Sequence, residues 1–195
     1  GPVEALFTVD EETGLTGAFE LGEGMLTGKY LVNLDSEDEG EIFIGCAGGI
    51  DTIATFHYTM EPSPKNYTFF RVDVSDLQGG HSGDDIDKGR VNSNKTVARL
   101  LWDGMQSFEL KLCYFNGGNL RNAIPREAYA IFGVPVRFKE EFVKRYNLFA
   151  ADLEAEFRFR EPNFKITLNE MPHVDEVLDS RTQSALVYSL VGVPN

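Results

Sequence analysis

The order of periodic apolar segments between residues 67 and 169 constrains the fold more than any other feature of this sequence. Apolar positions at helical spacing predict a helix over 92–105 and a longer one over 138–157. Alternating or continuous apolar runs predict strands over four segments, which are 67–77, 108–115, 127–134 and 164–169. The resulting β-α-β-β-α-β order is that of the ferredoxin-like arrangement, an antiparallel sheet with two helices on one face.

The preceding residues carry shorter signals. Small residues at 47–49 mark a boundary, which divides the chain into 1–49 and 50–195. Strands are predicted over 3–9, 30–34, 41–46 and 50–60, and a last helix over 174–190. The fold class is therefore α/β (α+β). Because the sequence opens on a strand-like run without an initiator Met, we expect an internal fragment of a longer protein.

Composition excludes several classes of partner. The 195 residues carry 18 Lys and Arg against 31 Asp and Glu, a net charge of −13, which disfavours binding to nucleic acid. No apolar run approaches membrane-spanning length, and no signal peptide is visible. Cys46 and Cys113 each lie in an apolar stretch, which predicts two buried thiols in a reduced cytoplasm.

An acidic run follows the predicted strand 30–34, with five acids between Asp35 and Glu41. The run matches the first half of a calcium-binding EF-hand loop, but the twelfth position would be Cys46 and predicted strands, not helices, flank it, which disfavours calcium. A solvated turn accounts for most of the run. Asp35 differs, because a carboxylate at the end of a buried strand needs a cation or several donors to offset its desolvation.

A second acidic group, Asp10, Glu11 and Glu12, ends the predicted strand 3–9. Adjacent side chains at a strand end point to opposite sides, so Glu11 and Glu12 could serve different tasks. One could bind a metal and the other could handle protons of a metal-bound water. A second solvated turn is the alternative.

Two glycine-rich loops complete the candidate features. In "GGHSGDDI" glycines surround His81, which is either a surface residue beside turn-forming acids or a side chain presented outward to polarise a carbonyl. The second loop, "FNGGNLRNAIPREA", contains Asn122 and is compatible with a long turn. His57 and His173 lie in no ligand motif.

Together, four segments in this order resemble the aminoacyl-histidine dipeptidases, of the zinc metallopeptidase family that includes the carnosinases: "TVDEETGLTGAFEL", "NLDSEDEGEIFIGCAGGID", "GGHSGDDI" and "FNGGNLRNAIPREA". The resemblance implies a dinuclear zinc hydrolase of Xaa-His and related dipeptides. It makes Glu11 the general base, Glu12 a ligand of one zinc and Asp35 a ligand of the other. His81 would stabilise the oxyanion, across the interface in dimeric relatives, and Asn122 would contact the substrate.

The family's remaining metal ligands are not found in this sequence, so the resemblance implies a partial protein. Residues 1–49 would be part of the catalytic domain, and 50–195 most of the first unit of a lid and dimerisation domain. We expect the fragment alone to be inactive and to retain no zinc. Its expected partners are a dipeptide substrate, the remainder of the same chain and a second copy. The alternative is a non-enzymatic ferredoxin-like self-association module, in which Glu11, Glu12 and Asp35 are scattered and solvated.

Overall fold

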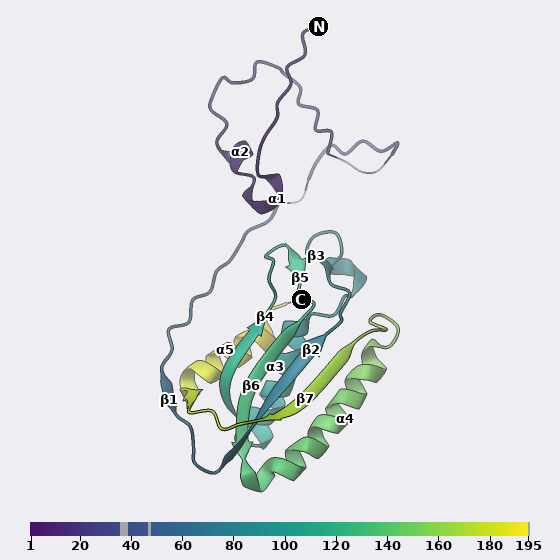
Figure 1. Ribbon diagram of the computed structural model, residues 1–195. Helices are drawn as coiled ribbons and strands as arrows, with labels where there is room; N and C mark the ends of the chain where they lie inside the picture. Colours follow the sequence, from purple (N-terminus) through teal and green to yellow (C-terminus); the bar gives the residue numbers. More distant parts are fainter. Residues whose placement is uncertain (36–38, 47, 195) are drawn as a thin grey trace. The chain divides into compact units, whose positions relative to one another are not determined.

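The computed structural model describes residues 1–35, 39–46 and 48–194 (Figure 1). The chain divides into two units, Gly1–Thr52 and Ile53–Asn195. This division lies close to the boundary expected at 47–49. Which domains of a longer protein the two parts represent stays a prediction.

A four-stranded antiparallel sheet forms the centre of the second unit. Its strands lie in the order β4-β6-β2-β7 and comprise β2 Tyr67–Ser75, β4 Lys111–Gly117, β6 Ala128–Pro135 and β7 Lys165–Met171. The two central strands, β2 and β6, pair from Tyr67↔Pro135 to Val74↔Ala128. The register places alternate residues of each strand on opposite faces, so the two faces have different compositions.

Two helices, α3 Ser93–Ser107 and α4 Lys139–Phe157, pack against one face of the sheet; in Figure 1 α3 lies behind the sheet and α4 runs beside β7. The N-terminus of α3 is capped by the Asn92 side chain, which accepts a hydrogen bond from the Lys95 amide at 3.3 Å. The four predicted strands and both predicted helices are present. The β-α-β-β-α-β order is therefore confirmed.

The remaining elements of the second unit are short, apart from α5 Ser180–Gly192, which packs against α3. The α5 helix begins later than the predicted 174–190. The short elements comprise β1 Met60–Pro62 paired with β8 Glu176–Leu178, β3 Gly80–His81 paired with β5 Ala123–Ile124, and two 3-10 turns, η1 Ile86–Lys88 and η2 Val136–Phe138. The strand predicted over 50–60 is wrong except at Met60.

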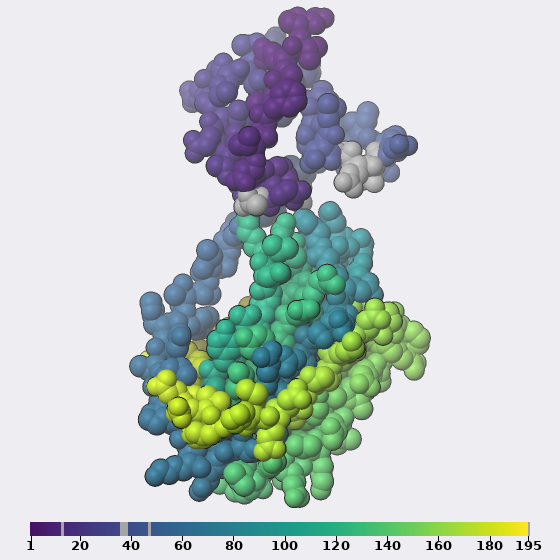
Figure 2. Space-filling view, viewed as in Figure 1, coloured from purple at the N-terminus to yellow at the C-terminus, as the bar shows by residue number. Residues whose placement is uncertain are grey.

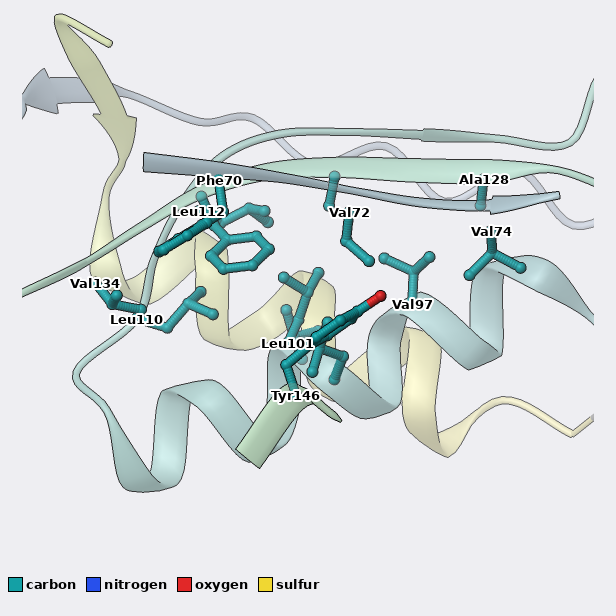
Figure 3. Packing of buried hydrophobic residues seen from close by; sticks show 14 of the residues in the cluster. Phe70, Val72, Val74, Val97, Leu101, Leu110, Leu112, Ala128, Val134 and Tyr146 are labelled. Carbon is teal, nitrogen blue, oxygen red and sulfur yellow. The ribbon is translucent and has the colours of Figure 1, made fainter. Parts of the chain in front are cut away.

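The core lies between the sheet and the helices (Figure 3). Phe70, Val72 and Val74 alternate along β2 and point toward the helices, which is the pattern predicted for a strand with one buried face. Phe142 of α4 contacts the ring of Phe70 with centroids 5.7 Å apart, and it packs edge-on against two further rings. Its ring therefore joins α4 to both the sheet and the segment after α3.

The opposite face of the sheet is covered in part by the segment after β7, which crosses it in Figure 2. Val177 of this segment packs with Phe69 and Cys113. A register irregularity between Leu112 and Tyr114 gives β4 an extra residue, so Leu112 and Cys113 are both buried, in different clusters. Burial raises the pKa of the Cys113 thiol to about 12.

The first unit differs from its prediction. Its described residues contain two single-turn helices, α1 Glu11–Gly14 and α2 Thr16–Phe19, and no strand. The strands predicted over 3–9, 30–34 and 41–46 are therefore wrong. An extended segment becomes a strand only when its backbone groups pair with a neighbour, and no pairing forms among these described residues. Their apolar side chains are exposed, Phe7 by 91% and Ile42 by 90%.

The buried state predicted for the two cysteines is confirmed for Cys113 and wrong for Cys46, which is exposed. Cys46 lies in the first unit, where the predicted strand that would have buried it is absent. None of the helices in the described part of the chain combines the length and apolar character needed to cross a lipid bilayer.

Replacement of Phe142 by Ala tests the packing of α4. Phe142 is 1% exposed, so Phe142→Ala should lower the free energy of unfolding by about 3–5 kcal/mol through lost burial and a cavity among the rings. Leu148 lies on the same helix and is 63% exposed, so Leu148→Ala is the matched control with little expected effect. Chemical denaturation measures both; equal losses would contradict the packing described.

Candidate functional site

Two of the sequence-predicted site residues, His81 and Asn122, are brought together by the β3–β5 pair. His81 lies opposite Ala123 in the register, and the Ser82 amide donates a hydrogen bond to the Asn122 carbonyl at 2.9 Å. The two residues come from loops that are separated by α3 and β4 in the sequence. The sequence offered no sign of this pairing, because each strand has only two residues.

Glycines permit the backbone path into His81. Gly79 has φ +66° and Gly80 has φ +150°, conformations that side-chain-bearing residues rarely adopt. A Cβ atom at Gly80 would also lie 2.5 Å from the Asp85 Oδ2 atom. The glycines before His81 therefore serve the tight backbone predicted from the sequence, and they let the Asp85 carboxylate approach the chain.

The His81 side chain is 53% exposed and lies over its own turn. Its Nδ1 atom accepts a hydrogen bond from the Gly83 amide at 3.1 Å and one from the Asp84 amide at 3.3 Å. The Asp84 carboxylate lies 3.9 Å from the same nitrogen but is 90% exposed. The ring is thus held by backbone groups from one side.

Asp85 closes this turn. Its Oδ2 atom accepts a hydrogen bond from the His81 amide at 2.7 Å, and its own amide donates to the His81 carbonyl at 3.0 Å. Its Oδ1 atom lies 2.7 Å from Lys88 Nζ and 3.9 Å from Arg90. The Lys88 ammonium, followed by the His81 amide, holds the pKa of the Asp85 carboxyl below its ordinary value.

A buried carboxylate joins the two ends of residues 78–91, which we call the His81 loop. Glu161 is 1% exposed and follows α4; it accepts hydrogen bonds from the Gln78 amide at 2.7 Å and the Val91 amide at 3.1 Å. The Gln78 side chain in turn bonds to the Arg160 carbonyl and to the Arg90 guanidinium. The loop is therefore anchored at both ends to the chain that leaves α4.

The predicted acids of the first unit do not form a site in the described residues. Glu11 and Glu12 lie on α1 and are exposed, and Asp35 is exposed in a segment without regular structure. Because α1 is a helical turn, the argument that a strand end points Glu11 and Glu12 to opposite sides does not apply here. Glu37 and Asp38 of the acidic run lie outside the described residues.

A metal ion therefore finds no complete ligand set in the described residues. Nowhere among them do three or more His, Cys, Asp or Glu side chains gather in a group able to hold a metal ion. Carboxylate oxygens are suitable zinc ligands, but a zinc site needs at least three protein ligands in one place. The residues present do not fit a zinc centre on their own.

Asp85 and Glu161 contribute to this site in ways that the sequence analysis missed. From the sequence, Asp85 is expected to be a turn former or part of a helix-entry cap, and Glu161 carries no motif. Glu161 anchors the loop through hydrogen bonds from two amides that lie 83 and 70 residues earlier in the chain. No periodicity or spacing reveals such a contact.

Comparison with known proteins identifies the relatives. The cytosol non-specific dipeptidase of Escherichia coli (strain K12) is 37% identical over 195 residues, which are 100% of this chain and 40% of that protein. The crystal structure of aminoacylhistidine dipeptidase from Vibrio alginolyticus matches with a TM-score of 0.84 and 39% identity, over 96% of this chain and 38% of that one. The chain is homologous to a segment of these dipeptidases.

The match extends over both units of the chain. Coverage of 96% must include most of Gly1–Thr52, so a solved dipeptidase contains a counterpart of the first unit as well as of the sheet and helices. No protein-family model matches the chain. The chain spans about 40% of the length of the curated relative that it matches.

Glu161→Gln tests the anchor of the His81 loop. An amide has one acceptor oxygen, so the variant leaves one of the two buried amides facing an NH₂ group. We expect a loss of about 1–3 kcal/mol in unfolding free energy and faster hydrogen exchange at Gln78 or Val91. Glu154→Gln, at an exposed position on α4, is the control. An unchanged exchange rate at both amides would contradict the anchor.

Acidification tests the Asp85 turn. Its pKa is lowered in the folded protein, so its stabilising contribution is complete above the unfolded carboxyl pKa of about 3.9 and is lost as the pH falls through the lower folded value. We expect the NMR signal of the Asp85 carboxyl carbon to titrate with a midpoint below the ordinary value of about 3.9. A midpoint above about 3.9 would contradict the Asp85 contacts.

Proposed function

We propose that this chain is part of a dinuclear zinc dipeptidase of the cytoplasm that hydrolyses Xaa-His and related dipeptides. The observation that carries this proposal is the identity of 37% to a cytosol non-specific dipeptidase across every residue of the chain. The segments that contain Glu11, Asp35 and His81 lie within the matched range.

The proposed roles follow the chemistry of each side chain. Glu11 would take the proton of the attacking water, and Glu12 and Asp35 would each contribute to one metal position. His81 and Asn122, joined by the β3–β5 pair, would contact the substrate. Bound zinc would lower the pKa of its water and polarise the scissile carbonyl. The missing ligands would come from the part of the longer relatives that this chain does not cover.

Exposed apolar side chains in the first unit support the proposal that further residues of a longer protein pack against this unit. Val3, Phe7 and Ile44 are more than 90% exposed, although such side chains are usually buried. Their segments were predicted as buried strands, and a neighbouring strand would both pair their backbone and cover their side chains. We propose that 1–49 belong to the catalytic domain and obtain these neighbours from the remainder of the same protein.

The second unit would act as the first ferredoxin-like unit of a lid domain. Its β-α-β-β-α-β order and its doubly anchored His81 loop suit the presentation of a side chain to a substrate held by another domain. A homodimer, in which His81 reaches the partner subunit, is a further part of the proposal. The segment alone is proposed to be inactive, because most metal ligands of such a centre are not among its residues.

The test uses a longer protein of the relatives' length that contains this sequence. It should release histidine from an Xaa-His dipeptide in a zinc-dependent reaction. Loss of a general base lowers turnover by about 100- to 10,000-fold, so Glu11→Ala should do so without changing the zinc content. Glu23→Ala, another exposed acid of the first unit, is the control. Unchanged turnover in Glu11→Ala would remove Glu11 from its role, and absent hydrolysis in the unmodified protein would refute the function.

A further inference from the structure

The hydrogen bonds around His81 define which ring nitrogen carries the proton. A neutral imidazole has one N–H donor and one acceptor nitrogen. Because Nδ1 accepts from the amides of Gly83 and Asp84, its lone pair is in use and the hydrogen belongs on Nε2. The nearby Asp84 carboxylate would favour a proton on Nδ1, but it is 3.9 Å away and 90% exposed, so solvent weakens its effect.

The direction of these two amides depends on the turn between residues 81 and 85. Asp85 makes two hydrogen bonds to the His81 backbone: its carboxylate accepts from the His81 amide, and its own amide donates to the His81 carbonyl. Lys88 and Arg90 face the same carboxylate and favour its charged form. Gly80 allows the carboxylate to reach the backbone, because a Cβ atom there would collide with it.

We propose that Asp85 is a positioning residue that holds His81 as the Nε2–H tautomer. In this state the ring presents a hydrogen-bond donor, while its acceptor nitrogen is occupied by the turn. His81 then suits an oxygen that gains negative charge, and it cannot serve as a proton acceptor or a metal ligand without losing its two backbone bonds. This inference rests on the proposed function, in which His81 donates to the carbonyl oxygen of the substrate.

The hydrogen bonds to Glu161 also help to fix the orientation of His81. The amides of Gln78 and Val91 are hydrogen-bonded to Glu161 beyond α4. Both ends of the His81 loop are therefore fixed, which restricts movement of the turn that Asp85 holds. A donor that is already oriented needs no reorganisation when negative charge develops, which is the main advantage of preorganised electrostatic stabilisation. The tautomer and the anchored loop together supply that orientation.

The first test is nitrogen NMR of the histidine rings in the 195-residue chain. The chain has three histidines, and His57 is exposed and serves as an internal reference for an unrestrained ring. We expect His81 to show a protonated Nε2 and an acceptor Nδ1 with no averaging, and its signals are assigned by their loss in His81→Gln. Averaged nitrogens like those of His57, or a protonated Nδ1, would overturn the proposal.

Variants of Asp85 separate positioning from general stability. Asp85→Ala should shift the His81 ring nitrogens toward the averaged values of His57, while Asp85→Asn, which keeps an oxygen for the His81 amide, should retain the single tautomer. Asp87→Ala removes an acid from the same loop and should change nothing. If Asp85→Ala leaves the ring signals unchanged in a folded chain, Asp85 does not position His81.

Kinetics in the longer protein distinguish this inference from the proposed function. Asp85→Ala should lower kcat by about 10- to 100-fold with little change in KM. This loss is smaller than the loss in kcat that follows removal of a complete oxyanion donor. Asp85→Asn should retain most of the original kcat. A raised KM with an unchanged kcat would overturn the positioning role of Asp85. Absence of hydrolysis in the unmodified protein would refute the proposed function, whereas the ring-nitrogen result would still decide the tautomer.

Discussion

The need of every extended segment for a partner strand governs this chain. In the second unit, β2 pairs on both sides and its alternating side chains form one wall of a core that α3 and α4 complete. In the first unit, apolar segments with comparable sequence patterns pair with nothing among the described residues and stay exposed. The same physical rule thus yields a packed sheet in one unit and extended chain in the other.

This contrast explains what the sequence could predict about the fold. The elements between residues 67 and 169 were predictable because each apolar pattern meets its complement within the same unit: Val72 and Val74 of β2 face Val97 and Leu101 of α3. The segments 3–9 and 41–46 carry equally apolar residues, but a pattern states only that a face will be covered and not by which residues. Cys46 was predicted to be buried for the same reason and is exposed.

The candidate site was predictable only in its individual residues. The glycines around His81 indicated an unusual backbone, and Gly79 and Gly80 do have positive φ. The pairing of His81 with the Asn122 loop, and the bonds from Glu161 to both loop ends, depend on tertiary contacts that no local pattern encodes. Glu11, Glu12 and Asp35 were selected as strand-end acids; the described residues bring no metal-binding group of side chains together, so their roles stay a prediction.

The two cysteines differ in a way that has practical value. The Cys113 thiol lies inside the second unit with its pKa raised to about 12, so at neutral pH it presents almost no thiolate. Cys46 lies exposed in the first unit. A maleimide dye would therefore attach to one defined position without mutagenesis, and its fluorescence would report whether any added polypeptide covers the first unit.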